Sequence, residues 1–175
     1  MYPDHALEPP EFEAAIQHGM RRSGPLLYRP LCPGCRKCQP YRLEAASFQM
    51  SDSQKRVWKR CDGKFEIWMA RPTADAEKLE LYRRYGEFQH GKGYADAGSY
   101  AEFLVDSIVE TYEIQWRKEG QLAAVSIVDI LPGGLSSVYS YWEPELKDWS
   151  IGTYTALCEI EMCRRHHLPY YIWDS

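Results

Sequence analysis

The chain has 175 residues, of which 45% are hydrophobic and 14% aromatic, so it is long enough to form one domain with a sizeable core. Its formal charge of −4 argues against a generally basic nucleic-acid-binding surface, although Lys and Arg are clustered enough to form a local basic groove. The opening MYPDHALEPP lacks the pattern of a secretory signal, and no stretch is apolar enough to span a membrane. Six cysteines, three of them close together, fit a reducing compartment, so we expect a cytoplasmic protein.

Apolar spacing and turn residues predict the following elements in chain order. They are a helix over 10–20, short strands over 26–32 and 39–48, a basic helix over 53–61, a strand over 65–70, helices over 74–91 and 98–107, an antiparallel three-stranded meander over 111–142, a helix over 150–167 and a strand over 170–173. This order predicts an α+β layer fold. We expect an N-terminal region, 1–62, and a core, 63–175, packed as one compact unit.

The short strands flank the segment RPLCPGCRKCQPYR, in which Cys32, Cys35 and Cys38 are each separated by two residues. This spacing suits zinc or an iron–sulfur cluster, but a structural site of either kind normally needs four protein ligands. A fourth ligand could be external or come from one of three residues: Cys61, His5 or His18. The other interpretation is three free thiols on a loop.

Five sequence blocks, in a characteristic order, resemble the arginyl-tRNA–protein transferases and their bacterial leucyl-transferring relatives. The blocks are GMRRSGPLLYRP, CPGCRKC, SQKRVWKR, VSIVDILPGGLSSVYSYWEPELKDWSIGTYTAL and LPYY. The resemblance runs from about residue 18 to 171, and its most specific parts are 21–24 and 129–152. It implies a fold like that of the GCN5-type N-acetyltransferases. It also implies transfer of an amino acid from tRNA to the α-amine of a protein that begins with Asp or Glu, which marks that protein for degradation.

Two departures from the family pattern lie at the ends of the chain. Members usually begin with a further cysteine-bearing segment, whereas this chain opens with MYPDHALEPP. Members also continue beyond the LPYY block, whereas this chain reads LPYYIWDS. The resemblance strengthens the metal interpretation of Cys32, Cys35 and Cys38, because relatives use cysteines here together with those of the missing segment.

An acidic N-terminus needs a cation, and the arginine fork matches a carboxylate in two hydrogen bonds. The residues predicted to bind the acidic N-terminus are Arg21, Arg22, Ser23 and Tyr28, with Arg29 and Arg42 behind them. An unpaired tRNA 3′ end needs cations and aromatic stacking surfaces, and the basic helix offers both, with Trp58 interleaved. The residues predicted to bind tRNA are Lys55, Arg56, Lys59, Arg60, Ser150, Gly152 and Thr153. In GCN5-like enzymes the corresponding 150–153 loop holds coenzyme A, but here it lacks multiple glycines.

The reaction itself needs little from the protein, because the tRNA ester is already activated and an α-amine has a pKa near 8. Alignment and oxyanion stabilisation can supply most of the rate, so we expect neither a covalent intermediate nor a cofactor for the chemistry. Strand alternation places Ser137, Tyr139 and Tyr141 on one face, and Asp129 precedes the turn. The predicted catalytic residues are therefore Ser137, Tyr139 and Asp129.

Three functions remain open from the sequence. The leading one is an aminoacyl-tRNA–protein transferase that donates leucine or arginine. It would be a monomer whose partners are aminoacyl-tRNA and proteins with N-terminal Asp or Glu, with no membrane involved. The second is a coenzyme A-dependent N-acetyltransferase, and the third is a truncated, non-catalytic RNA-binding relative with a cysteine knuckle.

Overall fold

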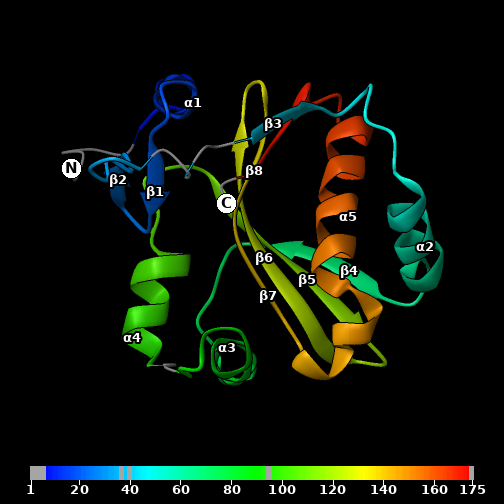
Figure 1. Ribbon diagram of the computed structural model, residues 1–175. Helices are drawn as coiled ribbons and strands as arrows, with labels where there is room; N and C mark the ends of the chain where they lie inside the picture. Colours follow the sequence, from blue (N-terminus) through cyan, green and yellow to red (C-terminus); the bar gives the residue numbers. More distant parts are fainter. Residues whose placement is uncertain (1–6, 36–37, 39–40, 94–95, 174–175) are drawn as a thin grey trace.

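The structure is a computed structural model that describes residues 7–35, 38, 41–93 and 96–173. Its centre is a six-stranded sheet in the order β3-β8-β7-β6-β5-β4, with a separate two-stranded hairpin, β1-β2 (Figure 1). Neighbouring strands of the sheet are antiparallel except β7 and β8, which are parallel. This confirms the predicted α+β class, with an antiparallel meander flanked by helices.

The elements follow the predicted order with small differences at their ends. The strands are β1 (Arg21–Ser23), β2 (Leu26–Tyr28), β3 (Tyr41–Glu44), β4 (Glu66–Ala70), β5 (Thr111–Lys118), β6 (Gln121–Leu131), β7 (Gly134–Trp142) and β8 (Tyr170–Trp173). The helices are α1 (Pro9–Gln17), α2 (Asp52–Cys61), α3 (Ala76–His90), α4 (Ala97–Tyr100), the π-helical η1 (Ala101–Val105), the 3-10 helix η2 (Pro144–Trp149) and α5 (Ile151–Arg165). Two elements, β1 and η2, were not predicted, and both are very short.

Helices cover both faces of the sheet (Figure 1). On one face α5 lies beside α2, and their apolar side chains pack around Trp116, Tyr154 and Cys158. On the other face α3, α4 and η1 cover the centre, while α1 covers one end through Phe12 and Ile16. The N-terminal region thus contributes β3 and α2 to the same sheet and core as the rest of the chain.

The geometry around β7 positions the site. Across β6 and β7, Ile127 pairs with Tyr139 but the next residue, Val128, pairs with Ser137, so Val138 is an extra residue in a β-bulge. The parallel pairing with β8 also ends at Ser137, opposite Trp173. We call this point, where β7 continues without β8 among the described residues, the fork.

None of the helices formed by the described residues is long and apolar enough to cross a membrane.

Candidate active site

The RRSG motif forms a buried anchor. The Arg22 Nε and Nη2 atoms donate to the two carboxylate oxygens of Asp129 at 2.6 and 2.7 Å, and Nη2 also donates to the Thr111 hydroxyl at 3.2 Å. The Arg22 and Asp129 side chains are 1% and 0% exposed. Gly24 adopts φ +55°, and a Cβ there would lie 1.9 Å from the carbonyl oxygen of Glu102. The motif therefore ties the β1-β2 hairpin to β5 and β6 and to η1.

This anchor changes the interpretation of two predicted site residues. The paired N–H donors of the Arg22 guanidinium already bind a carboxylate inside the protein. In this structure Arg22 is therefore not placed to bind the carboxylate of a substrate. Both oxygens of Asp129 are occupied by Arg22, and one also accepts from Thr111 at 2.6 Å, so Asp129 does not present itself to an amine. Their common role in this structure is to hold the hairpin.

The other residues predicted to bind an acidic N-terminus lie on the same hairpin. Arg21 is buried, with 7% of its surface exposed, and Ser23 is partly buried. Tyr28 is 39% exposed at the end of β2. Next to it, Arg29 donates to the backbone carbonyl of His18, which links the hairpin to α1. The structure thus brings these residues together on the β1-β2 hairpin.

The prediction that Ser137, Tyr139 and Tyr141 share one face of the sheet is confirmed for the two tyrosines and wrong for Ser137. Alternation requires an unbroken strand, and the bulge at Val138 shifts the register between Ser137 and Tyr139. Ser137 pairs with Val128, which packs on the α5 face, whereas Tyr139 pairs with Ile127, which packs on the α3 face. The two predicted catalytic hydroxyls are therefore on opposite faces beside the fork.

On the α3 face, Tyr139 belongs to a cluster of aromatic side chains. Its ring centroid lies 5.2 Å from that of Phe103 and 6.1 Å from that of Tyr82. Tyr141 is fully buried, and its hydroxyl is 2.7 Å from that of Tyr100, with which it shares a hydrogen bond. Burial raises the pKa of Tyr139 and Tyr141 well above the usual tyrosine value, so both phenols stay protonated and can donate hydrogen bonds but not act as bases.

On the α5 face, a carboxyl that was not predicted from the sequence lies behind the fork. Glu159 is 1% exposed, and its Oε2 accepts from the Tyr171 hydroxyl at 2.9 Å. Burial raises the pKa of Glu159, and the hydroxyls of Tyr171 and Ser137 oppose this shift in part. A helical position within an apolar stripe gave no sequence signal for this group. It links α5 to β8 directly beside the last β7-β8 pair.

The predicted tRNA-binding residues gather along α2 and the start of α5, which lie side by side (Figure 1). The four basic side chains of α2 are exposed, and Arg60 at its end donates to the carbonyl of Asp148, two residues before Ser150. Trp58 does not lie among them as a free stacking surface. Its ring packs against Tyr154 of α5, with centroids 5.6 Å apart, because it is on the apolar face of the helix.

Ser150 precedes α5, in the position where a serine often caps a helix. It adopts the left-handed conformation, φ 54° and ψ 45°, and its side chain makes no capping hydrogen bond. Gly152 packs closely on Trp142, since a Cβ there would lie 3.1 Å from Trp142 Nε1 and would need a shift of a few tenths of an ångström. Thr153 is exposed on the first turn. The start of α5 is thus a strained, open turn adjacent to the basic end of α2.

The three loop cysteines, Cys32, Cys35 and Cys38, are exposed and free of disulfides. The Cys35 N–H donates to the Cys32 carbonyl at 3.1 Å, with Pro33 and a left-handed Gly34 between them, as in a type II turn. Within the part of the chain that the structure describes, no three His, Cys, Asp or Glu side chains lie close enough to hold a metal ion. His5, one candidate for a fourth ligand, lies outside the described residues.

The remaining cysteines, Cys61, Cys158 and Cys163, are buried in the core. Burial raises the pKa of Cys158 to about 11 and that of Cys163 to about 12, so neither thiol is a nucleophile near neutral pH. These groups therefore suit packing rather than a covalent intermediate.

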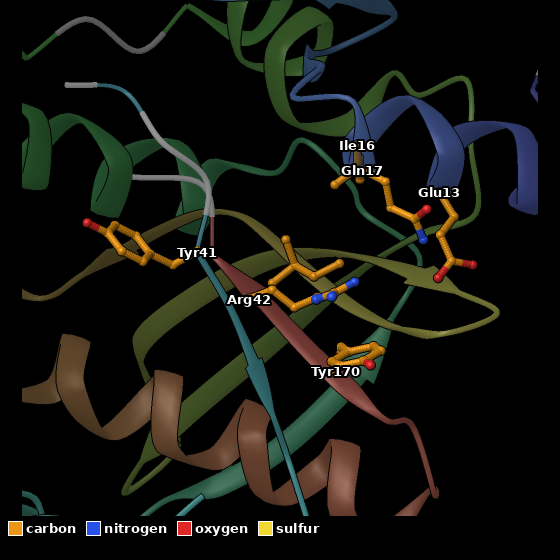
Figure 2. Close-up of a pocket in the computed structure, with 7 residues that line it drawn as sticks. Glu13, Ile16, Gln17, Tyr41, Arg42 and Tyr170 are labelled. Atoms are coloured by element: carbon orange, nitrogen blue, oxygen red, sulfur yellow. The ribbon is translucent and has the colours of Figure 1, made fainter. Parts of the chain in front are cut away.

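A pocket of about 370 Å³ lies between α1 and the outer strands β3 and β8, close to the fork (Figure 2). Arg42 extends into it from β3, and its guanidinium carbon lies 4.1 Å from the centroid of the Tyr170 ring. The sequence placed Arg42 only behind the RRSG arginines. Its signal was weak because the strand pairing that brings β3 beside β8 joins residues far apart in sequence.

Comparisons with known proteins agree with this architecture. The chain matches two family models, described as "Arginine-tRNA-protein transferase, N terminus" over residues 1–56 and "Arginine-tRNA-protein transferase, C terminus" over residues 77–173. Among solved structures, it superposes on the C-terminal DUF2156 domain of an Agrobacterium fabrum protein with a TM-score of 0.57 at 8% identity, over 96% of this chain and 52% of that one. L-PGS from Bacillus licheniformis gives 0.53 at 11% identity, over 96% of this chain and 50% of that one. These two likenesses concern the fold alone.

Curated relatives share much more of the sequence. The aspartate/glutamate leucyltransferase of Chromobacterium violaceum is 37% identical over 172 residues, which cover 96% of this chain and 70% of the relative. The protein of the same name from Nitrosococcus oceani is 38% identical over 173 residues, covering 96% of this chain and 72% of the relative. This chain thus spans about 70% of the length of these relatives. From the two family models and these relatives, the chain belongs to the arginine-tRNA-protein transferase family and is an aminoacyltransferase.

Proposed function

We propose that the chain transfers leucine from charged tRNA to the α-amine of proteins that begin with Asp or Glu. The observation that carries this proposal is the similarity to proteins named aspartate/glutamate leucyltransferase, at 37% and 38% identity over 96% of the chain. Such a transfer would mark its substrates for degradation. It would take place in the cytoplasm, where charged tRNA is made, and with the chain acting as a monomer.

The reacting groups would meet at the fork. Beyond Ser137, backbone N–H groups of β7 would donate to the developing oxyanion. Tyr139, held protonated in this part of β7, can supply a further donor. The amine nitrogen forms the amide bond, the ester C–O bond breaks, and the proton lost by the amine passes to the ribose oxygen of the tRNA. The protein contributes alignment, not a nucleophile.

The tRNA would approach along α2 and the start of α5. The exposed cations of α2, Lys55, Arg56, Lys59 and Arg60, suit backbone phosphates. Arg60 extends this basic surface to the turn at Ser150 through its contact with Asp148. The 3′ end would pass this turn and enter the fork from the α5 face.

A transfer assay tests the proposal. Peptides that begin with Asp, Glu or Ala would be incubated with the protein and with tRNA carrying radiolabelled leucine or arginine. The expected result is leucine label on the Asp and Glu peptides but not on the Ala peptide. Arginine label would replace leucine as the donor. The absence of label from both tRNAs, with the protein folded, would refute the proposed reaction, and retained tRNA binding would then favour a non-catalytic role.

A further inference from the structure

The pocket between α1 and the β3-β8 edge has walls of opposite charge. It is lined by Glu13, Ile16, Gln17, Tyr41, Arg42, Tyr170 and Ile172. Its volume of about 370 Å³ falls in the range of small-ligand sites. Figure 2 shows Arg42 extending into this space from the strand side while Glu13 enters from the helix side. A ligand that fits must therefore carry a negative group and, a short distance away, hydrogen-bond donors.

Arg42 is the cation of this pocket that can accept a new partner. Its guanidinium stacks on the Tyr170 ring, and it makes no hydrogen bond or ion pair with another residue in the described part of the chain. Stacking leaves the N–H edge of a guanidinium free for a carboxylate. By contrast, Arg22 is bound to Asp129 and Arg29 to the His18 carbonyl.

Glu13 fixes the other end of the pocket. Its Oε2 accepts from the Gly133 N–H at 3.2 Å, and a Cβ at Gly133 would lie 2.2 Å from Oε1, so only glycine allows the carboxylate this close. The carboxylate is thereby held against the β6-β7 turn. It can still accept from a ligand N–H group, because a carboxylate has about four acceptor positions.

Strand register places these groups in line with the fork. Ser137 pairs with Trp173 at the fork, Arg42 pairs with the preceding residue Ile172, and Glu13 binds at the level of Tyr170, whose N–H donates to Gly133. Successive residues of a strand are about 3.3 Å apart. The order along β8 is therefore fork, cation, anion, over three residue steps, or roughly 10 Å.

We propose that this pocket holds the N-terminal acidic residue of the acceptor protein, an inference that rests on the proposed function. The side-chain carboxylate pairs with Arg42, the α-amine points to the fork, and a peptide N–H further along the acceptor chain donates to Glu13. An N-terminal Asp or Glu matches this order of groups. Arg42 is thus a specificity-determining residue, whereas Arg22 is not.

The test compares peptides that begin with Glu and Gln, which differ only in the charge and donor pattern of one group. Binding is measured by calorimetry without tRNA, and kcat/KM is measured with leucyl-tRNA. Arg42→Gln is expected to lower both quantities about 10- to 100-fold for the Glu peptide and less than about twofold for the Gln peptide. Arg42→Lys should restore part of the loss, because lysine keeps the positive charge but not the paired N–H donors of a guanidinium. Glu13→Gln should weaken both peptides to a similar, smaller extent.

The matched control is Arg83→Gln, which removes an exposed arginine on α3 and should change neither peptide. If Arg42→Gln leaves the preference for Glu over Gln intact while transfer proceeds, the pocket assignment is overturned and the proposed function stands. An equal loss for both peptides also overturns it. If the wild-type protein transfers nothing, the proposed function fails, and Arg42-dependent binding of the Glu peptide then decides the pocket by itself. Free glutamate binding as tightly as the peptide would overturn a site for protein N-termini.

Discussion

Replacing Asp129 with asparagine removes one charge from the buried Arg22–Asp129 pair and keeps the shape of the side chain. Two hydrogen bonds of 2.6 and 2.7 Å join the partners, whose side chains are 1% and 0% exposed. The variant leaves the guanidinium of Arg22 buried without a counter-charge. Breaking a buried pair in this way costs about 3–5 kcal/mol, so the free energy of unfolding should fall by that amount.

Urea denaturation followed by far-ultraviolet circular dichroism measures this loss. For a chain of this length, 1 kcal/mol corresponds to about 2–4 °C, so the midpoint of thermal unfolding should fall by roughly 6–20 °C. The control is Glu87→Gln on α3, which breaks an exposed 3.1 Å pair with Arg83. An exposed pair of this kind contributes at most about 0.5 kcal/mol.

A loss below about 1 kcal/mol for Asp129→Asn, with an unchanged m-value, would refute the view that this pair anchors the hairpin. The double variant Arg22→Met/Asp129→Leu gives an independent check. An apolar pair of similar size needs no desolvation of charge, so this variant should recover most of the lost stability. The double variant should also keep the preference for peptides with an acidic N-terminal residue if Arg42, and not Arg22, binds that residue.

Three further outcomes are expected. Burial raises the folded-state pKa of Glu159, so the stability that this side chain contributes is fully present below the unfolded pKa near 4.3 and is lost as pH rises through the folded pKa. Glu159→Gln should therefore gain stability relative to the wild type from about pH 4 to neutral pH. A difference in urea midpoints that does not change with pH would contradict this. The double variant Lys55→Gln/Lys59→Gln should weaken tRNA binding. The slope of the logarithm of the binding constant against the logarithm of the salt concentration should fall by about 0.7–0.9 for each tRNA phosphate that the lysines no longer neutralise. An unchanged slope in a filter-binding assay would show that α2 is not part of the tRNA interface. A thiol reagent should modify three exposed cysteines quickly and three buried ones slowly; protection of the fast group until a chelator is added would instead indicate a bound metal ion at the loop.

Local patterns were sufficient to predict most of the fold. The apolar stripe of Ile151, Tyr154 and Leu157 marked the core helix α5, and the turn residues marked the meander, because these signals act between neighbours in the sequence. The start of α2 is set by an equally local contact, since the Ser51 hydroxyl accepts from the Gln54 N–H at 3.3 Å.

The site was harder to predict because it depends on contacts between distant residues. A single extra residue, Val138, puts Tyr139 on the opposite face of the sheet from Ser137, and nothing in the local sequence pattern predicted a bulge there. Arg22 looked like a substrate-binding group because its partner, Asp129, is 107 residues away. Arg42 looked secondary because its place beside Tyr170 follows only from the pairing of β3 with β8.

Ser150 has a strained backbone conformation and is also predicted to bind tRNA. The variant Ser150→Gly tests these two properties separately. The residue sits in the left-handed region, where a Cβ costs about 1–2 kcal/mol, and its hydroxyl makes no capping bond that would offset this. Glycine removes the Cβ but increases the freedom of the unfolded chain, so a net gain of up to about 1 kcal/mol in unfolding free energy is expected.

If the hydroxyl contacts the tRNA 3′ end, the same Ser150→Gly variant should have a raised KM for charged tRNA despite its greater stability. Glu119→Gly is the matched control, because Glu119 has nearly the same φ, 53°, in the β5-β6 turn, where no role in transfer is proposed. It should gain stability and keep its KM. Equal KM values for both variants would mean that strain at Ser150 serves the packing of α5 alone, and would remove this residue from the tRNA-binding surface.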